Sequence, residues 1–331
     1  MKSKKFNFIL LLLFTALVLY FSLKDNFSDV MSYIIKMNPI WFIIAFLLMV
    51  VYWLFKAIIT REYVKNYKSD YTLVKSFRLQ LETMFFNGVT PFSTGGGPFQ
   101  ILSLKKDGVR VSQGANVMVV TSFLHQTSLA TFMMISVLAN HFLTLFAKSN
   151  LIRNLSLLGF IICIIFMGFL LLIMFNRNFN KAIARNVIKL LNKAHIVKNK
   201  DEMIKKWYAY IESISEGSTI IKKDKQKFLK CYIYGLIAML AYISVTYAVA
   251  KGMGLNIELY KVIIATSYVQ MIGMFVPIPG GTGGLELAFT NLYANFISGS
   301  LISSLMLVWR FITYYLGIVL GGIVLNLKKR K

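Results

Sequence analysis

Long uncharged runs separated by short charged segments make up most of this chain. About 30 Å of bilayer hydrocarbon divided by a helical rise of about 1.5 Å gives roughly 20 residues for one spanning helix. The runs that approach or exceed this length are Phe6–Leu23, Met37–Phe55, Val111–Ala147, Asn154–Asn176, Cys231–Ala250 and Leu301–Leu327. They predict an all-α polytopic membrane protein with about six transmembrane helices. The first run also resembles the apolar part of a signal peptide, but it lacks a small-residue cleavage pattern, and we interpret it as a helix.

Two further apolar stretches are interrupted in their middle by glycine and proline. They are Met84–Leu104 and Val262–Ile297. Irregular backbone is tolerated at membrane depth only where protein or a water-filled cavity satisfies its free N–H and C=O groups. In transporters such breaks often mark the substrate site. We therefore predict two re-entrant Gly/Pro hairpins, which gives about six to eight hydrophobic segments in total.

The two breaks align with each other without a gap. The aligned pairs are Pro91 with Pro277, Gly95 with Gly281, Gly97 with Gly283, and Gln100 with Glu286. Each break stands between apolar helices, so the alignment predicts two units of helix, hairpin and helix in an inverted repeat. We place the first repeat core at residues 84–176 and the second at 228–327, within one transmembrane domain that spans 1–331. A single break is explained equally well by close helix packing, but two matched breaks favour the repeat.

Composition and charge narrow the class further. The 331 residues are 57% hydrophobic and 15% charged, and 37 Lys and Arg against 13 Asp and Glu give a formal net charge of +24. In a membrane protein such a surplus follows from basic cytoplasmic loops, so a soluble nucleic-acid-binding protein is disfavoured. Most basic residues collect on one side if both termini are cytoplasmic and each hairpin returns to the side from which it entered. Residues 177–227 are then a basic cytoplasmic loop.

Smaller features exclude some kinds of chemistry. Residues 204–214 form either a helix on the bilayer surface or part of a solvated loop, and the second interpretation is favoured. Cys163 and Cys231 lie far apart in sequence and the histidines are scattered, so neither a disulfide framework nor a metal site is indicated. The sequence indicates no cofactor. Its glycine-rich turns lack the strand, lysine and spacing of a nucleotide-binding P-loop.

The glycine-rich turns are candidate sites for a phospholipid head group. Glycine removes side chains where backbone N–H groups face a ligand, and the helix that follows adds the positive end of its dipole. Hydroxyl side chains add further donors for a phosphate. The candidate residues in the two turns are Ser93, Thr94, Gly95, Gly96, Gly97, Gly280, Gly281, Thr282, Gly283 and Gly284.

Charged and titratable side chains complete the candidate site. Glu286 follows the second turn, where a carboxylate is favoured by the helix dipole but costly in hydrocarbon without a partner. Arg310 is the expected partner, because its distance from Leu301 in sequence places it roughly 14 Å deep. The pair either binds a head group or locks the hairpin, and both interpretations stay open.

A polar stripe on the helix after the first hairpin contains His125. Its other members are Asn116, Thr121, Ser122 and Gln126. The stripe either lines the same cavity or forms interhelical hydrogen bonds, and for His125 the second interpretation is favoured.

The segment Pro277–Glu286, together with Asn87–Pro91 and the glycines that follow, resembles the transmembrane region of the lysylphosphatidylglycerol synthase family. Its members are also called flippase-like or multiple peptide resistance factor proteins. The resemblance covers nearly the whole chain and implies a protein of the bacterial cytoplasmic (inner) membrane. Larger relatives move lysylphosphatidylglycerol across the bilayer, which reduces negative surface charge and confers resistance to cationic antimicrobial peptides. They also carry a C-terminal domain that transfers lysine from lysyl-tRNA to phosphatidylglycerol, and this chain stops at Lys331 with no visible place for that chemistry.

Two functions from different classes follow. The first is a lipid translocase whose partner is an anionic or lysyl-modified phospholipid. The second is a phosphatidylglycerol lysyltransferase, or a membrane subunit of a separately encoded synthase, and only this function would bring in a nucleic acid, as lysyl-tRNA. We find no convincing nucleophile and base in the loops and no catalytic residue, so an enzyme is disfavoured. The sequence is compatible with a homo-oligomer and leaves the lipid, direction and energy source open.

Overall fold

The computed structural model describes residues 32, 35–90, 93–146, 150–193, 203–204, 207–208, 211, 224–273, 276, 281, 283–297 and 300–327. Within these ranges every regular element is helical, which confirms the predicted all-α class. The predicted helix Phe6–Leu23 and most of 204–214 lie outside the described residues. The same is true of several residues at the breaks, among them Pro91, Pro277, Gly280 and Thr282.

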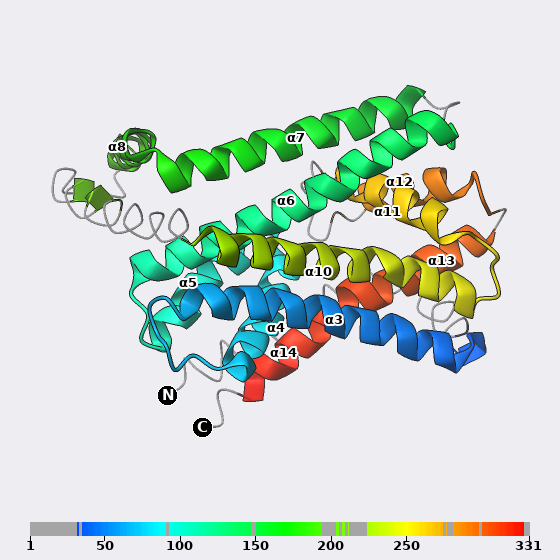
Figure 1. The fold of residues 1–331 in the computed structure, drawn as a ribbon, viewed down its shortest axis with the longest axis horizontal. Helices are drawn as coiled ribbons and strands as arrows, with labels where there is room; N and C mark the ends of the chain where they lie inside the picture. Colours follow the sequence, from blue (N-terminus) through cyan, green and yellow to red (C-terminus); the bar gives the residue numbers. More distant parts are fainter. Residues whose placement is uncertain are drawn as a thin grey trace.

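Two long helices, α3 (Pro39–Val64) and α10 (Lys225–Gly252), lie side by side at the centre of the molecule (Figure 1). They run antiparallel, because the N–H of Asn38 before α3 donates to the carbonyl of Gly252 at the end of α10. Aromatic side chains pack along the whole contact. The ring pairs are Trp41 with Tyr247, Tyr52 with Tyr242, and Phe55 with Tyr234, at 6.2, 5.1 and 5.4 Å between centroids.

Both glycine breaks form helical hairpins. The first joins α4 (Leu73–Val89) to α5 (Gly96–Lys106), and the second joins α11 (Leu259–Gly273) to α12 (Gly284–Tyr293). In the first, Gly96 donates its N–H to Asn87, and Ser103 approaches Glu82, so α5 folds back along α4. In the second, Gly273 lies against Leu285, and the Tyr293 hydroxyl shares a hydrogen bond with Thr266.

The two hairpins start from opposite ends of the molecule (Figure 1). The first begins where α3 ends and the second begins where α10 ends, and those two helix ends are opposite because the helices are antiparallel. The first hairpin leads to α6 (Val111–Leu143), and the second leads to α13 (Ser300–Arg310) and α14 (Leu316–Leu327). The helix contacts of the two halves correspond. The contact of α3 with α4 corresponds to that of α10 with α11, and the contact of α4 with α14 corresponds to that of α11 with α6. This is the arrangement of an inverted repeat.

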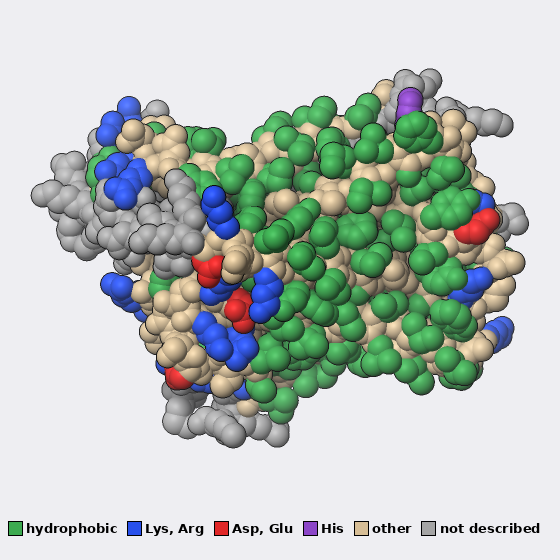
Figure 2. Space-filling model, in the orientation of Figure 1, with side chains coloured by type: hydrophobic (Ala, Val, Ile, Leu, Met, Phe, Trp, Pro, Cys, Tyr) green, Lys and Arg blue, Asp and Glu red, His purple; other side chains and the backbone are tan. Residues whose placement is uncertain are grey.

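The apolar surface is compatible with a bilayer. Four helical segments are long and apolar enough to cross one, namely α3, α6, α10 and the run Leu301–Leu327. A fifth arises if α7 (Asn150–Phe175) and α8 (Arg177–Lys193), which are bent by 99° at Asn176, count as one broken span. Figure 2 shows a broad band of hydrophobic side chains on one face, with Lys and Arg gathered mainly at one end. The described residues thus hold four or five candidate spans, where the sequence predicted about six over the whole chain.

Candidate functional site

A cavity of about 750 Å³ with polar side chains in its wall lies between the two hairpins. Both hairpins contribute to its wall, together with the crossing of α3 and α10, the middle of α6 and the end of α13. Polar side chains from segments far apart in the sequence meet there. They include Tyr52, Lys56, Ser93, Thr94, Thr121, Ser122, His125, Gln126, Tyr242, Gln270 and Arg310.

The first turn meets the cavity through only part of its predicted residues. Ser93, Thr94 and Gly97 line the cavity, whereas Gly95 and Gly96 face their own hairpin. The N–H of Gly95 donates to the Thr90 hydroxyl at 2.8 Å, and the N–H of Gly96 donates to the Asn87 side chain at 2.9 Å. These two N–H groups are therefore already hydrogen-bonded within the first hairpin.

The second turn also lines the cavity with only some of its predicted residues. Gly281 lines the cavity, in a left-handed conformation (φ +68°) that favours glycine, whereas Gly283 and Gly284 do not. The N–H of Gly283, the residue before α12, donates to Glu286 Oε2 at 2.6 Å. A carboxylate at the third helical position thus caps its own helix, as in a capping box. Of the predicted cradle, the N–H of Gly283 is therefore bonded to a side chain of its own hairpin, while Gly280 lies outside the described residues.

Glu286 and Arg310 form the expected ion pair. Arg310 Nε donates to Glu286 Oε1 at 2.9 Å, and Nη2 lies 2.8 Å from the same oxygen. The side chain of Arg310 is 5% exposed and that of Glu286 is 23% exposed. The guanidinium also lies 5.6 Å from the Trp309 ring centroid and 5.3 Å from that of Tyr314, within cation–π range. Arg310 lines the cavity. Glu286 is not among the lining residues and contacts Arg310 instead.

A π-helical turn, Phe311–Tyr315, follows Arg310 directly. Single π-turns inside α-helices are rare and frequently occur at functional sites. Within this turn Tyr314 donates its hydroxyl to the carbonyl of Gly88 in the first hairpin, at 2.6 Å. One helical segment thus holds the second hairpin through Arg310 and the first hairpin through Tyr314.

The polar stripe of α6 divides between the two predicted roles. Thr121, Ser122, His125 and Gln126 line the cavity. Asn116 does not, because it is buried and its amide donates to the Tyr67 hydroxyl at 3.1 Å. The geometry therefore places His125 on the cavity wall, and no hydrogen bond joins it to another of the described residues.

Lys56 is a cavity residue that the sequence analysis missed. It lies inside α3, which continues to Val64 rather than ending near Phe55 as predicted. Its ammonium is 3.5 Å from the Tyr52 hydroxyl and 5.4 Å from the centroid of the same ring. The only available signal was its position one residue after an apolar run, which is also the position of an ordinary flanking lysine.

The sequence of this chain is similar to those of known membrane proteins. A family model for the transmembrane region of lysylphosphatidylglycerol synthase matches residues 8–321. The chain belongs to this family. Among its relatives, a UPF0104 membrane protein from Archaeoglobus fulgidus is 25% identical over 304 residues, which cover 89% of this chain and 88% of the relative. Another from Pyrococcus horikoshii is 22% identical over 98% of both chains.

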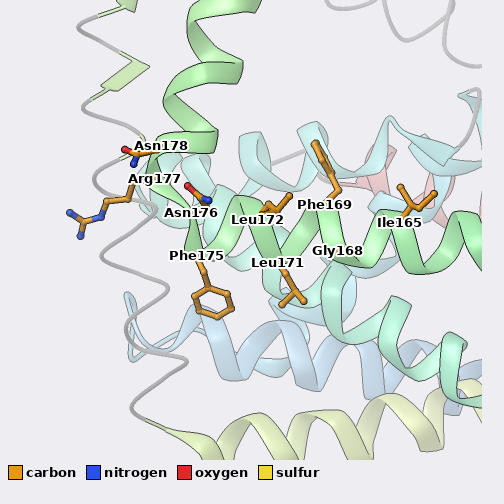
Figure 3. A pocket seen from close by; sticks show the side chains of 9 residues that line it. All are labelled: Ile165, Gly168, Phe169, Leu171, Leu172, Phe175, Asn176, Arg177 and Asn178. Atoms are coloured by element: carbon orange, nitrogen blue, oxygen red, sulfur yellow. The ribbon is translucent and has the colours of Figure 1, made fainter.

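A second depression in this family member lies at the end of α7 and the start of α8, with a volume of about 1150 Å³. Figure 3 shows its lining side chains, which run from Ile165 to Asn178. Its polar side chains come only from the consecutive residues Asn176, Arg177 and Asn178, and the rest of the described lining is apolar or glycine, so it does not bring together polar groups from distant segments. In the described part of the chain, no cluster of His, Cys, Asp and Glu is suited to a metal ion. The central cavity is therefore the candidate functional site of this family member.

Proposed function

We propose that the protein moves a phospholipid between the two leaflets of a membrane, with the head group in the central cavity and the acyl chains in the surrounding lipid. The observation that carries the proposal is the position of this cavity between two hairpins that start from opposite ends of the molecule. Displacement of one hairpin or the other would open the cavity toward one end at a time. This is the alternating access that inverted repeats provide in secondary transporters.

The polar and charged wall supports a head group as the cargo. Charged and polar side chains inside a membrane protein are costly, and they commonly mark a substrate pathway. Here they line a cavity of about 750 Å³, which lies within the usual size range of small-molecule sites. The site residues proposed for the head group are Ser93, Thr94, Gly97, His125, Gly281 and Arg310, with Glu286 positioning Arg310.

The orientation is part of the proposal. Lys65, Lys105, Arg110 and Lys227 lie at the end from which the first hairpin starts, whereas Lys251 and Lys261 lie at the other end. By the positive-inside rule, the first end faces the cytoplasm, which also puts the segment after α8 on that side. The proposed membrane is a prokaryotic cytoplasmic membrane. This class includes the bacterial membrane implied by the resemblance. Resistance to cationic antimicrobial peptides, which the resemblance implies, would follow only if the lipid moved outward were lysyl-modified.

Reconstitution tests the proposal. Purified protein in vesicles with a fluorescent phosphatidylglycerol in the inner leaflet is expected to speed quenching by a reagent added outside. Vesicles without protein, and vesicles with the protein heat-denatured before reconstitution, are the controls. Quenching at the rate of empty vesicles for every phospholipid tried would contradict the proposal. Lysylphosphatidylglycerol formed from lysyl-tRNA and phosphatidylglycerol would favour the lysyltransferase alternative instead.

A further inference from the structure

The charged groups on the cavity wall do not balance. The described lining contains two fully basic side chains, Lys56 and Arg310, and no aspartate or glutamate. Arg310 is neutralised by Glu286 at 2.8 Å. No carboxylate lies within ion-pair distance of Lys56 among the described residues, and its closest polar contact is the Tyr52 hydroxyl. The cavity therefore has an excess positive charge, located at Lys56.

Other lysines also contact tyrosine rings, but their surroundings differ from those of Lys56. Lys251 and Lys230 lie 5.6 and 5.7 Å from the ring centroids of Tyr247 and Tyr234. Both stand near the ends of α10, and the ammonium of Lys251 also donates to Asn256 at 2.9 Å. Lys56 makes the same ring contact in the interior of α3, and its charge faces the cavity.

An ammonium in an enclosed space is unfavourable unless another charge or water compensates it. Desolvation of such a group costs several kcal/mol, and a hydrogen-bonded counter-ion offsets that cost. A phosphate oxygen is a suitable counter-ion, because charge-assisted hydrogen bonds are about twice as strong as neutral ones. Neutral acceptors such as the Tyr52 hydroxyl compensate less.

We propose that Lys56 binds the phosphate of a head group with net negative charge, and that a lysyl-modified head group is not the preferred ligand. Phosphatidylglycerol is anionic through its phosphate. A lysyl ester adds an α-ammonium and an ε-ammonium group, which reverses the net sign. The described lining offers these ammonium groups no free carboxylate, since Glu286 is held by Arg310 and by the N–H of Gly283.

This inference rests on the proposed function for its membrane context, and it adds the substrate class. It also bears on the energy source. With the cytoplasmic side negative, a membrane potential favours outward movement of an anionic head group by about 2.3 kcal/mol per charge per 100 mV. A net-cationic head group would instead be driven inward.

A binding measurement tests the inference without requiring transport. The purified full-length chain in neutral detergent is titrated with phosphatidylglycerol, lysylphosphatidylglycerol and phosphatidylcholine, and bound lipid is counted by native mass spectrometry. Phosphatidylglycerol is expected to bind at least tenfold more tightly than the other two. Lys56→Gln should remove this preference, Lys56→Arg should keep it, and Lys251→Gln is the matched control that should leave it unchanged. Lys56→Met replaces the glutamine variant if that variant does not fold.

Three outcomes would overturn the inference. They are equal binding of the three lipids, tighter binding of the lysyl lipid, and an unchanged preference in Lys56→Gln. Inorganic phosphate and glycerol phosphate are tested as competitors. Displacement of the lipid by either at millimolar concentration would assign the site to a soluble phosphate rather than to a lipid. Lys56-dependent binding without transport in vesicles would contradict the proposed function alone, whereas transport of the lysyl lipid that is unaffected by Lys56→Gln would contradict this inference alone.

Discussion

The hydroxyl of Tyr314 donates a 2.6 Å hydrogen bond to the carbonyl oxygen of Gly88. Gly88 is the last residue but one of α4, so its carbonyl is among those that a helix end leaves without an intrahelical partner. Tyr314 stands one turn after Arg310, which is paired with Glu286 of the second hairpin. The two hairpins are therefore connected through a single π-helical turn, and movement of one is expected to affect the other.

Replacement of Tyr314 by phenylalanine tests this connection. The ring stays beside Arg310, while the Gly88 carbonyl loses its donor, and the free energy of unfolding should fall by about 1 kcal/mol. Transport should slow by more than this loss of stability explains, because the hairpins are no longer coupled. Melting temperature and vesicle quenching rate are measured together. Tyr260→Phe, on the exposed face of α11, is the control and should change neither.

Removal of one partner of the ion pair should be costly, and the two partners should differ. Glu286→Gln leaves Arg310 buried without a counter-charge, whereas Arg310→Gln leaves Glu286, which is partly exposed and keeps the N–H of Gly283. We expect a loss of about 3 kcal/mol for Glu286→Gln and less for Arg310→Gln. The double variant should lose less than the sum of the two. Chemical denaturation of all three variants measures these differences.

The exposed pair Glu258–Lys261, at 2.9 Å, supplies the control for that cycle. Its glutamine variants should each leave the free energy of unfolding nearly unchanged, because solvent screens surface pairs. Measuring the transport rate of the variants distinguishes a structural role of the Glu286–Arg310 pair from a functional one. If the double variant is stable and still transports at the normal rate, the Glu286–Arg310 pair only locks the hairpin. We expect it to be stable and inactive.

Alanine substitutions at two adjacent glycines of α14 should have opposite effects on the free energy of unfolding. A Cβ at Gly321 would overlap the backbone carbonyl of Leu81 in α4, and backbone atoms have little room to move. A Cβ at Gly322 would lie 3.6 Å from the Phe85 ring, which is an ordinary contact. Gly321→Ala should therefore lose about 1–3 kcal/mol, while Gly322→Ala should be neutral or gain up to about 1 kcal/mol from helix propensity. Equal melting temperatures would contradict the close packing of α14 on α4.

A membrane potential should bias the lipid distribution. With the vesicle interior negative by about 100 mV, phosphatidylglycerol should shift to the outer leaflet, because about 2.3 kcal/mol per charge favours that direction. The potential is set with a potassium gradient and valinomycin, and reversal of the gradient should reverse the shift. A distribution that ignores the sign of the potential would mean that the head group crosses without net charge.

Much of the fold follows from the sequence, because bilayer thickness fixes helix length and Gly with Pro breaks helices. The hairpins and the pairing of Glu286 with Arg310 were predicted on these grounds, since a carboxylate in an apolar setting requires a cation. Lys56 was missed because a lysine just after an apolar run is usually a flanking residue. The N–H groups of Gly95, Gly96 and Gly283 are hydrogen-bonded within their own hairpins, and a head-group role for the glycines stays a prediction. Sequence spacing does not reveal that side chains within each hairpin accept hydrogen bonds from these N–H groups.

Accessibility of the two hairpins from each side tests the central claim most directly. Thr94→Cys and Val276→Cys are suitable, because a Cβ at Gly95 or Gly281 would collide with Thr90 or Leu285. Each is introduced into a variant in which Cys163 and Cys231, both buried, are alanine. In sealed vesicles, an impermeant thiol reagent should label each position from the inside and from the outside, and bound phosphatidylglycerol should slow both reactions. Positions that never react, or that react from the same single side, would contradict a cavity that opens alternately to the two sides of the membrane.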